Sequence, residues 1–330
     1  MRKTVCATLA VMMSVLFSPL SQAGQAWESY KARFFKPEGR IVDTGNGGVS
    51  HTEGQGFAML MAVVNDDKAT FDKLWQWTNR ELKNKENGLF YWRYNPAESN
   101  PVADKNNAAD GDVLIAWALL KADARWHEKR YGAASDAITK ALVAHSVIRY
   151  AGYRVMLPGV QGFKLDGEVV LNPSYFVFPA WQAFAGRSHL PVWRDLIKDG
   201  KRLLGKMGSG KANLPTDWVS LASGGKLAPA KGWAPRMSYD AIRIPLYVAW
   251  VDKQSPLLTP WRVWFGQFPR EQTPAWVNVT TNEYAPYMME GGLLAVRDLT
   301  MGQSSTEPEI TSKDDYYSAS LKMLVWIAQQ

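Results

Sequence analysis

The chain has 330 residues, with 38 Lys and Arg, 31 Asp and Glu, and a formal net charge of +7. Basic and acidic residues are interleaved, without the clustered basic stripe of nucleic-acid-binding domains, so no nucleic-acid partner is expected. No stretch reaches the roughly 20 apolar residues of a membrane-spanning helix, so no membrane span is expected.

The first 23 residues have the pattern of a signal peptide. Two basic residues precede a largely apolar stretch over residues 5–17, and Ser21-Gln22-Ala23 places small residues where a signal peptidase cleaves. We therefore expect cleavage after Ala23 and export, either secreted or periplasmic. The one cysteine, Cys6, would be removed, so the mature chain would use neither a disulfide nor a thiolate metal site.

Residues 24–330 are predicted to form a single helical domain, because no stretch of them resembles a linker. The stretches after Glu53 and over residues 113–122 are apolar on nearly every side, whereas neighbouring helices have a polar face. Helices are expected over residues 27–35, 68–82, 113–122, 126–150, 175–185 and 191–206, after Glu53, and from near residues 238, 259, 284 and 313. A short hairpin is expected in residues 152–173 and a loop over residues 208–235.

The alternation of apolar and amphipathic helices predicts inner helices packed against outer ones. The lack of a βαβ pattern argues against a doubly wound sheet, and the lack of a fixed repeat argues against a solenoid. An antiparallel α/α toroid would place the loops before the inner helices at one mouth of the ring, although a plain helical bundle fits the same pattern. The expected fold class is therefore all-α with a few short strands in loops, and a monomer is expected.

Glu53 stands where a polar turn meets an apolar helix, in His51-Thr52-Glu53-Gly54-Gln55-Gly56. The two glycines are expected to leave open space beside Glu53, which suits a carboxyl that acts as an acid. The simpler interpretation is helix capping, because acidic residues stabilise the first turn of a helix. On this stretch alone, capping is favoured.

Two further acidic stretches precede apolar helices. One contains Asp110 and Asp112, and in the other Asp240 follows Tyr239 and precedes Arg243 by about one helical turn. One acid in each stretch could cap the following helix, but Asp112, the second acid of the first pair, is not needed for capping. Tyr239 and Arg243 would hold Asp240 in its ionised form. In a ring of hairpins these helix starts would converge with that of Glu53.

Convergent carboxyls in unlike environments would suit hydrolysis of a glycosidic bond, which needs a protonated acid and an ionised base. The 15 Trp, 13 Tyr and 12 Phe agree with a sugar ligand, although a Trp-rich core accounts for most of them. Asp240 is the better base, whereas a helix N-terminus would lower the pKa of Glu53 and oppose its action as an acid. The four His lack metal-binding spacing and nucleotide-binding motifs are missing, so no metal or cofactor is expected.

Four motifs surround these acids. They are Thr52-Glu53-Gly54-Gln55-Gly56, Ala109-Asp110-Gly111-Asp112 with Ala116 and Trp126 downstream, Asn172-Pro173-Ser174-Tyr175-Phe176, and Tyr239-Asp240-Ala241-Ile242-Arg243-Ile244-Pro245. In their order and spacing they resemble glycoside hydrolase family 8, the bacterial endo-1,4-β-glucanases. The resemblance implies an (α/α)6 barrel and cleavage inside β-1,4-linked glucan chains with inversion at the anomeric carbon.

The resemblance also implies roles for individual residues. Glu53 would be the proton donor and Asp240 the base that activates water, while Asp110 would contact the sugar at the cleavage site and orient and distort its ring. Residues that would bind substrate nearby are Asp112, Tyr175, Tyr239 and Arg243, with Trp92 as a stacking platform. Ala109 stands where the family usually has Ser or Thr, which leaves open how Asp110 is held.

Alternatives remain open for the substrate polymer and for whether the protein catalyses hydrolysis. The same mechanism can act on chitosan, xylan or mixed-linkage glucan, and the same scaffold can bind glucan without turnover. The part of the chain after residue 270 matches no motif, and Tyr316 and Tyr317 fit either a substrate-binding surface or the core. The expected partner is a β-glucan polysaccharide or oligosaccharide.

Overall fold

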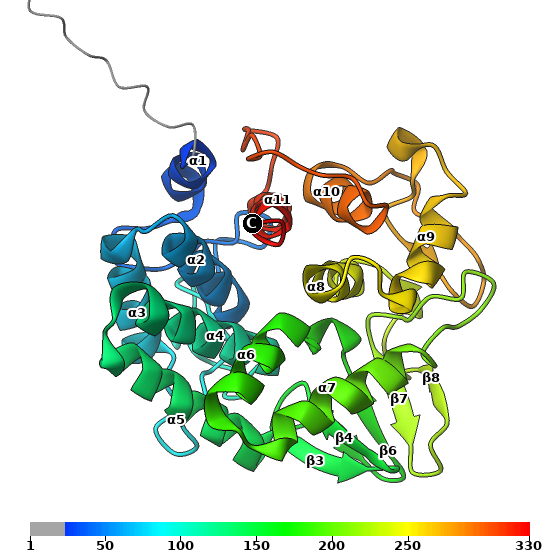
Figure 1. The fold of residues 1–330 in the computed structure, drawn as a ribbon, viewed down its shortest axis with the longest axis horizontal. Helices are drawn as coiled ribbons and strands as arrows, with labels where there is room; N and C mark the ends of the chain where they lie inside the picture. Colours follow the sequence, from blue (N-terminus) through cyan, green and yellow to red (C-terminus); the bar gives the residue numbers. More distant parts are fainter. Residues whose placement is uncertain (1–23) are drawn as a thin grey trace, which may run out of the picture.

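The computed structural model describes residues 24–330, and the predicted signal peptide lies outside the described residues. Figure 1 shows helices arranged as a two-layered ring. Six of the described helices form the inner layer, and each contacts the next: α2 (Thr52–Val64), α4 (Ala109–Trp126), α6 (Phe178–Ser188), α8 (Arg243–Val251), α10 (Gly291–Thr300) and α11 (Tyr316–Ile327). Contact between α11 and α2 closes the ring. The fold is therefore the predicted (α/α)6 barrel.

The outer layer covers this ring. Within residues 24–330 it contains α1 (Gln25–Phe34), α3 (Lys68–Glu81), α5 (Lys129–His145), α7 (Pro191–Leu204) and α9 (Thr259–Phe265). α3 packs on α2, α5 on α4, α7 on α6, α9 on α10 and α1 on α11. The inner helix α2 is buried from Gly54 to Val63, whereas α7 buries one stripe that includes Trp193, Leu196 and Leu203. This difference confirms the predicted alternation of apolar and amphipathic helices.

Two glycines allow α2 and α4 to approach closely. A Cβ atom at Gly56 would lie 2.5 Å from the Cβ of Leu114, and one at Gly111 would lie 2.0 Å from Oγ1 of Thr52. A side chain at either position would force the helices apart, because the core has no room to absorb it. The close contact places the acidic first turns of the two helices side by side.

Short antiparallel strands occupy the loops. Three pairs are β1 (Ser50–His51) with β2 (Arg93–Tyr94), β3 (Val147–Tyr150) with β4 (Tyr153–Met156), and β9 (Arg236–Met237) with β10 (Val277–Asn278). A four-stranded sheet has the order β5 (Lys164–Leu165), β6 (Glu168–Leu171), β7 (Val219–Ala222), β8 (Leu227–Pro229). The expected hairpin is confirmed as β5–β6.

The prediction that residues 208–235 form only a loop is wrong. β7 and β8 lie within this range, and β7 pairs with β6 in a register that opposes Leu221 to Val169 and Val219 to Leu171. All four side chains are buried. The strand is formed by a partner far away in the sequence, so the local turn-rich composition concealed it.

Some helix boundaries also differ from the expected ones. α8 begins at Arg243 rather than near residue 238, and α10 begins at Gly291 rather than near residue 284. α5 ends at His145, and the chain continues as β3. Among residues 24–330, no helix combines the length and the hydropathy needed to cross a bilayer.

Candidate active site

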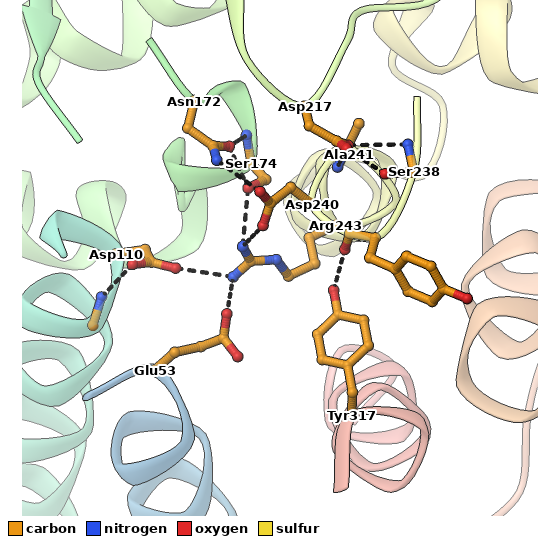
Figure 2. A network of polar contacts seen from close by, with 12 residues as sticks. Glu53, Asp110, Asn172, Ser174, Asp217, Ser238, Asp240, Ala241, Arg243 and Tyr317 are labelled. Atoms are coloured by element: carbon orange, nitrogen blue, oxygen red, sulfur yellow. Dashed lines mark hydrogen bonds and ion pairs between the residues drawn. The ribbon is translucent and has the colours of Figure 1, made fainter. Parts of the chain in front are cut away.

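Arg243, in the first turn of α8, is the centre of a cluster of carboxyl groups. Its Nη1 lies 2.7 Å from Oε2 of Glu53 and 2.9 Å from Oδ2 of Asp110, and its Nη2 lies 2.9 Å from Oδ1 of Asp240 (Figure 2). The arginine side chain is 1% exposed, whereas those of Glu53 and Asp240 are 19% and 34% exposed. The structure thus brings together the three acids predicted to be catalytic, at the converging starts of α2, α4 and α8.

Asp240 receives a second hydrogen bond from the third motif. Nδ2 of Asn172 donates to its Oδ2 at 3.1 Å. Oδ1 of Asn172 accepts from both the backbone N–H and the hydroxyl of Ser174, and Oγ of Ser174 accepts from Nη2 of Arg243 at 3.1 Å. Each Asp240 oxygen therefore has a fixed donor, which holds the carboxylate in one orientation.

Glu53 has a second partner in Tyr316, the first residue of α11. The Tyr316 hydroxyl donates to Oε1 of Glu53 at 3.3 Å. A Cβ atom at Gly54 would lie 2.6 Å from the same hydroxyl oxygen. The prediction of open space beside Glu53 is therefore wrong, because α11 packs on α2 and Tyr316 occupies that space. Tyr316 is 2% exposed and belongs to the core.

The surroundings of the acids change their proton affinity. Burial raises the pKa of Glu53 above its usual value, the positive charge of Arg243 opposes this rise, and the charge of Asp240 adds to it. Burial raises the pKa of Asp110 to about 6, again against the influence of Arg243 and with that of Glu53. Burial thus opposes the effect of the helix N-terminus on Glu53. The site can retain a proton on a carboxyl closer to neutral pH than an exposed acid could.

Asp110 is the most deeply buried of the three acids. Its side chain is 2% exposed, and its Oδ1 accepts the backbone N–H of Gly111 at 2.8 Å. Together with Arg243, this N–H gives each Asp110 oxygen a donor. Asp110 is therefore held in place without a hydroxyl from residue 109.

Aromatic residues surround the cluster. The ring of Tyr175 lies with its centroid 5.7 Å from Cζ of Arg243. Tyr239 is 44% exposed, and its carbonyl oxygen accepts a hydrogen bond from the hydroxyl of Tyr317. Trp92 lies next to the start of α2, because its carbonyl oxygen accepts the backbone N–H of Thr52. Tyr175 and Tyr239 thus lie beside the acids, whereas the indole of Trp92 donates to Oδ2 of Asp104 at 2.7 Å and stacks on His51.

Asp112 is separate from this cluster, although it was predicted to bind substrate. Its Oδ1 accepts the backbone N–H of Phe90 at 2.9 Å, and its Oδ2 accepts Nδ2 of Asn107 at 2.8 Å. Its side chain is fully buried, and burial raises its pKa to about 7. Residues two apart on a helix point in different directions, so Asp112 holds the preceding loop while Asp110 reaches Arg243. This placement does not support the predicted contact with substrate.

Asp217 is a neighbour of the site that the sequence analysis did not identify. Its carboxylate accepts hydrogen bonds from Ser238 and Ala241, on either side of Asp240 (Figure 2). It lies just before β7, in the segment predicted to be a loop, so only the tertiary structure reveals it. In the part of the chain that the structure describes, no group of three or more His, Cys, Asp or Glu side chains is arranged to hold a metal ion.

The chain is similar to proteins of one enzyme family along its whole length. A family model described as Glycosyl hydrolases family 8 matches residues 1–330. An endoglucanase of Cellulomonas uda is 60% identical over 303 residues, which cover 92% of this chain and 84% of that protein. The crystal structure of endoglucanase Cel10, a family 8 glycosyl hydrolase from Klebsiella pneumoniae, shares 65% identity and a TM-score of 0.91, covering 92% of this chain and 98% of that one.

A more distant solved structure has the same fold. The endo-beta-1,4-glucanase CMCax from Acetobacter xylinum has a TM-score of 0.87 at 38% identity and covers 93% of this chain and 97% of that one. The resemblance first indicated by four short motifs is thereby confirmed: the chain belongs to family 8 of the glycosyl hydrolases.

Proposed function

We propose that the protein is an endo-acting glycoside hydrolase that cleaves internal β-1,4 bonds of cellulose-type glucans with inversion, with Glu53 as general acid and Asp240 as general base. The observation that carries this proposal is that three carboxyl groups, which differ in solvent exposure and in their neighbours, all bind the guanidinium group of Arg243. Inverting hydrolysis needs two carboxyls about 6.5–9.5 Å apart, with room for a water molecule between one of them and the sugar. Glu53 and Asp240 bind different terminal nitrogens of Arg243, so the guanidinium separates them.

Glu53 has the features of the proton donor. Burial raises its pKa, and its side chain still reaches the surface. A protonated Glu53 donates its proton to the glycosidic oxygen as the bond to the anomeric carbon breaks. The leaving chain departs as an alcohol, and Glu53 remains as a carboxylate beside Arg243.

Asp240 has the features of the base. It is the most exposed of the three carboxyls, and Arg243 and Asn172 fix both of its oxygens. Its carboxylate accepts a proton from water as the water oxygen attacks the anomeric carbon from the face opposite the leaving group. Asp110, the most deeply buried of the three acids, holds Arg243 and orients the ring of the sugar at the cleavage site in a distorted form.

The polymer is proposed from the relatives. The proteins named above are endoglucanases, and the Acetobacter enzyme is an endo-beta-1,4-glucanase. Tyr175 and Tyr239 beside the acids supply aromatic faces for glucose rings. Rates on carboxymethyl cellulose, mixed-linkage glucan, xylan and chitosan, measured side by side, should be highest on the first of these.

Export is part of the same proposal. The signal-peptide pattern of residues 1–23 supports cleavage after Ala23 and a periplasmic or secreted enzyme. A single domain over residues 24–330 and a monomeric state complete the proposal. Expression of the full chain in a bacterial host, followed by intact mass and size-exclusion measurements, tests it. The mass of residues 24–330 and a monomeric elution volume are expected, whereas retention of residues 1–23 would contradict export.

Substitution of each acid tests the catalytic roles. Glu53→Gln and Asp240→Asn should each reduce release of reducing ends from carboxymethyl cellulose by at least about 10³-fold, because each removes one half of acid–base catalysis. Binding of cello-oligosaccharides should persist in both variants. Asp112→Asn is a matched control in a buried acid outside the cluster. Near-normal rates in the first two variants would refute the roles, and a wild-type protein that binds but releases nothing would be a glucan-binding protein.

A further inference from the structure

The start of α8 carries Asp240 but does not use it as a cap. A helix leaves its first N–H groups without partners inside the helix, and a nearby Asp usually accepts from them. Here the oxygens of Asp240 face Nη2 of Arg243 and Nδ2 of Asn172 instead. Ile242, which precedes the helix, provides no side-chain hydrogen bond. The N–H groups of Arg243 and Ile244 donate to backbone carbonyl oxygens of the preceding turn. Those of Ser238 and Ala241 have no backbone acceptor within residues 24–330 and need another group.

Asp217 provides the missing acceptor from a different part of the chain. Its Oδ1 accepts the backbone N–H of Ser238 at 3.0 Å and that of Ala241 at 2.8 Å, and its Oδ2 accepts the hydroxyl of Ser238. These hydrogen bonds fix the backbone two residues before Asp240 and one residue after it. No other carboxylate among the described residues accepts from this turn.

Asp217 is itself held in place. Its backbone N–H donates to the carbonyl oxygen of Arg236 in β9 at 2.8 Å, and Trp218, the next residue, leads into β7. β9 pairs with β10, and β7 is an inner strand of the four-stranded sheet. The carboxylate is therefore fixed to two strand-containing segments that do not include Asp240.

We propose that Asp217 is a positioning residue for the general base: it caps the turn around Asp240, so that the Asp240 carboxylate remains free for catalysis in a fixed position. The inference rests on the proposed role of Asp240. It assigns two tasks to two aspartates, because a carboxylate that accepted the backbone N–H groups could not also face the substrate.

The positioning needs an acceptor oxygen at one place rather than a negative charge. Burial and the nearby Asp240 raise the pKa of Asp217 to about 6, and a protonated carboxyl still offers Oδ1 to two N–H groups. An amide in the same position offers the same oxygen, and the Ser238 hydroxyl can accept from the amide nitrogen. A longer side chain keeps the charge but moves the acceptor by about one C–C bond, roughly 1.5 Å.

Three substitutions distinguish position from charge. Asp217→Asn should keep kcat on carboxymethyl cellulose within about 5-fold of wild type, since it retains the acceptor oxygen. Asp217→Glu and Asp217→Ala should lower kcat by about 30- to 100-fold with KM changed less than about 3-fold, because small misplacement of a catalytic group has effects of this size. A charge-based role predicts the reverse order for Asn and Glu.

A buried aspartate elsewhere provides the structural control. Asp199 is 5% exposed, and its carboxylate accepts the backbone N–H of Arg154 at 2.8 Å, far along the chain from Asp240. Asp199→Ala should lower the melting temperature while kcat per folded molecule stays near the wild-type value. Folded protein in every variant is quantified by circular dichroism before the rates are compared.

The outcomes separate this inference from the proposed function. Full kcat in Asp217→Glu, or equal losses in Asp217→Asn and Asp217→Glu, would overturn the positioning role. If Asp217→Ala does not fold, the comparison of Asn with Glu still decides. Asp240→Asn, measured in parallel, tests the proposed function alone. If Asp240→Asn is active, the assignment of Asp240 as the base is refuted. If Asp240→Asn is inactive but Asp217→Glu is fully active, only the inference about Asp217 is refuted.

Discussion

Oε2 of Glu53 lies 2.7 Å from Nη1 of Arg243, which places the proposed acid in contact with a positive charge that favours its ionised form. Burial acts in the opposite direction and is the larger influence on the pKa of Glu53. The same guanidinium also contacts Asp110 and Asp240. Arg243 therefore makes it possible to bury several carboxyls together, and burial makes one of them an effective acid.

Removal of Arg243 should leave buried carboxyls without compensation. Arg243→Met should lower the free energy of unfolding at pH 7.5 by about 3–5 kcal/mol, the usual effect of breaking a buried ion pair. Part of this loss should be regained at pH 5, because removal of the Arg243 charge raises the pKa of both Glu53 and Asp110 further and their protonation in the folded state relieves their mutual repulsion. Urea unfolding at the two pH values measures the recovery.

A second buried arginine is the matched control for this experiment. Arg297 is 5% exposed, and its Nε donates to Oγ1 of Thr273 at 2.9 Å. Asp298, which it also approaches, keeps a separate ion pair with Arg270. Arg297→Met should therefore lose stability without recovery at pH 5. Equal recovery in both variants would contradict the assignment of the effect to the carboxyl cluster.

The hydroxyl of Tyr316 should tune the proposed acid. Its hydrogen bond lowers the pKa of Glu53, so Tyr316→Phe should raise that pKa. A general acid loses activity as it deprotonates, and the basic limb of the kcat/KM profile should therefore move to higher pH. Tyr317→Phe is the control, because the Tyr317 hydroxyl donates to the carbonyl oxygen of Tyr239 instead. A basic limb that stays in place in Tyr316→Phe would argue against Glu53 as the acid.

Asp112 should make stability depend on pH without contributing to catalysis. Its pKa of about 7 in the folded protein exceeds the value of about 3.9 for an unfolded Asp. Its contribution to stability is therefore fully present below about pH 4 and is lost as the pH rises through 7. Relative to wild type, Asp112→Asn should gain roughly 2–4 kcal/mol in unfolding free energy between pH 4.5 and pH 8.

Two measurements on Asp112→Asn check this account. Chemical denaturation at both pH values gives the gain in stability, and steady-state kinetics on a soluble glucan gives kcat/KM. A change in kcat/KM of less than about 3-fold is expected for a side chain that does not contact substrate. A large rise in KM, with the same stability as wild type at every pH, would restore the earlier assignment of Asp112 to substrate binding.

Gly54 should not tolerate a side chain. A Cβ atom there would lie 2.6 Å from the Tyr316 hydroxyl oxygen, so Gly54→Ala should cost about 1–3 kcal/mol of stability and displace the partner of Glu53. Thermal unfolding and kcat measure the two effects. Gly186, in α6, has nothing within 4 Å of a built Cβ atom, so Gly186→Ala should be neutral or stabilising. Equal behaviour of the two variants would refute the packing argument.

Much of the fold could be predicted because its helices differ in their surroundings. An inner helix such as α2 is buried on nearly all sides, an outer helix such as α7 on one, and both patterns are visible in the sequence. The strand β7 could not be predicted, because its pairing with β6 joins distant segments. The exact start of α8 was also missed, because the turn before it is stabilised by Asp217 from another loop.

The site divides in the same way. Glu53, Asp110, Asp240 and Arg243 lie at helix starts that the barrel brings together, so motif and topology sufficed to group them. The direction in which each side chain points could not be predicted from the sequence. Asp112 points away from Asp110 two residues before it, and Tyr316 fills the space expected to be open beside Gly54. Both features depend on packing between elements, which no local pattern records.

The stereochemistry of the first product tests the central claim most directly. Proton NMR of the anomeric region, recorded during the first minutes of hydrolysis of a soluble cello-oligosaccharide, distinguishes the newly formed α-anomer from the β-anomer before they equilibrate. With Glu53 as acid and Asp240 activating water on the opposite face, the new reducing end should appear as the α-anomer. Initial release of the β-anomer would indicate retention through a covalent intermediate and would contradict the account.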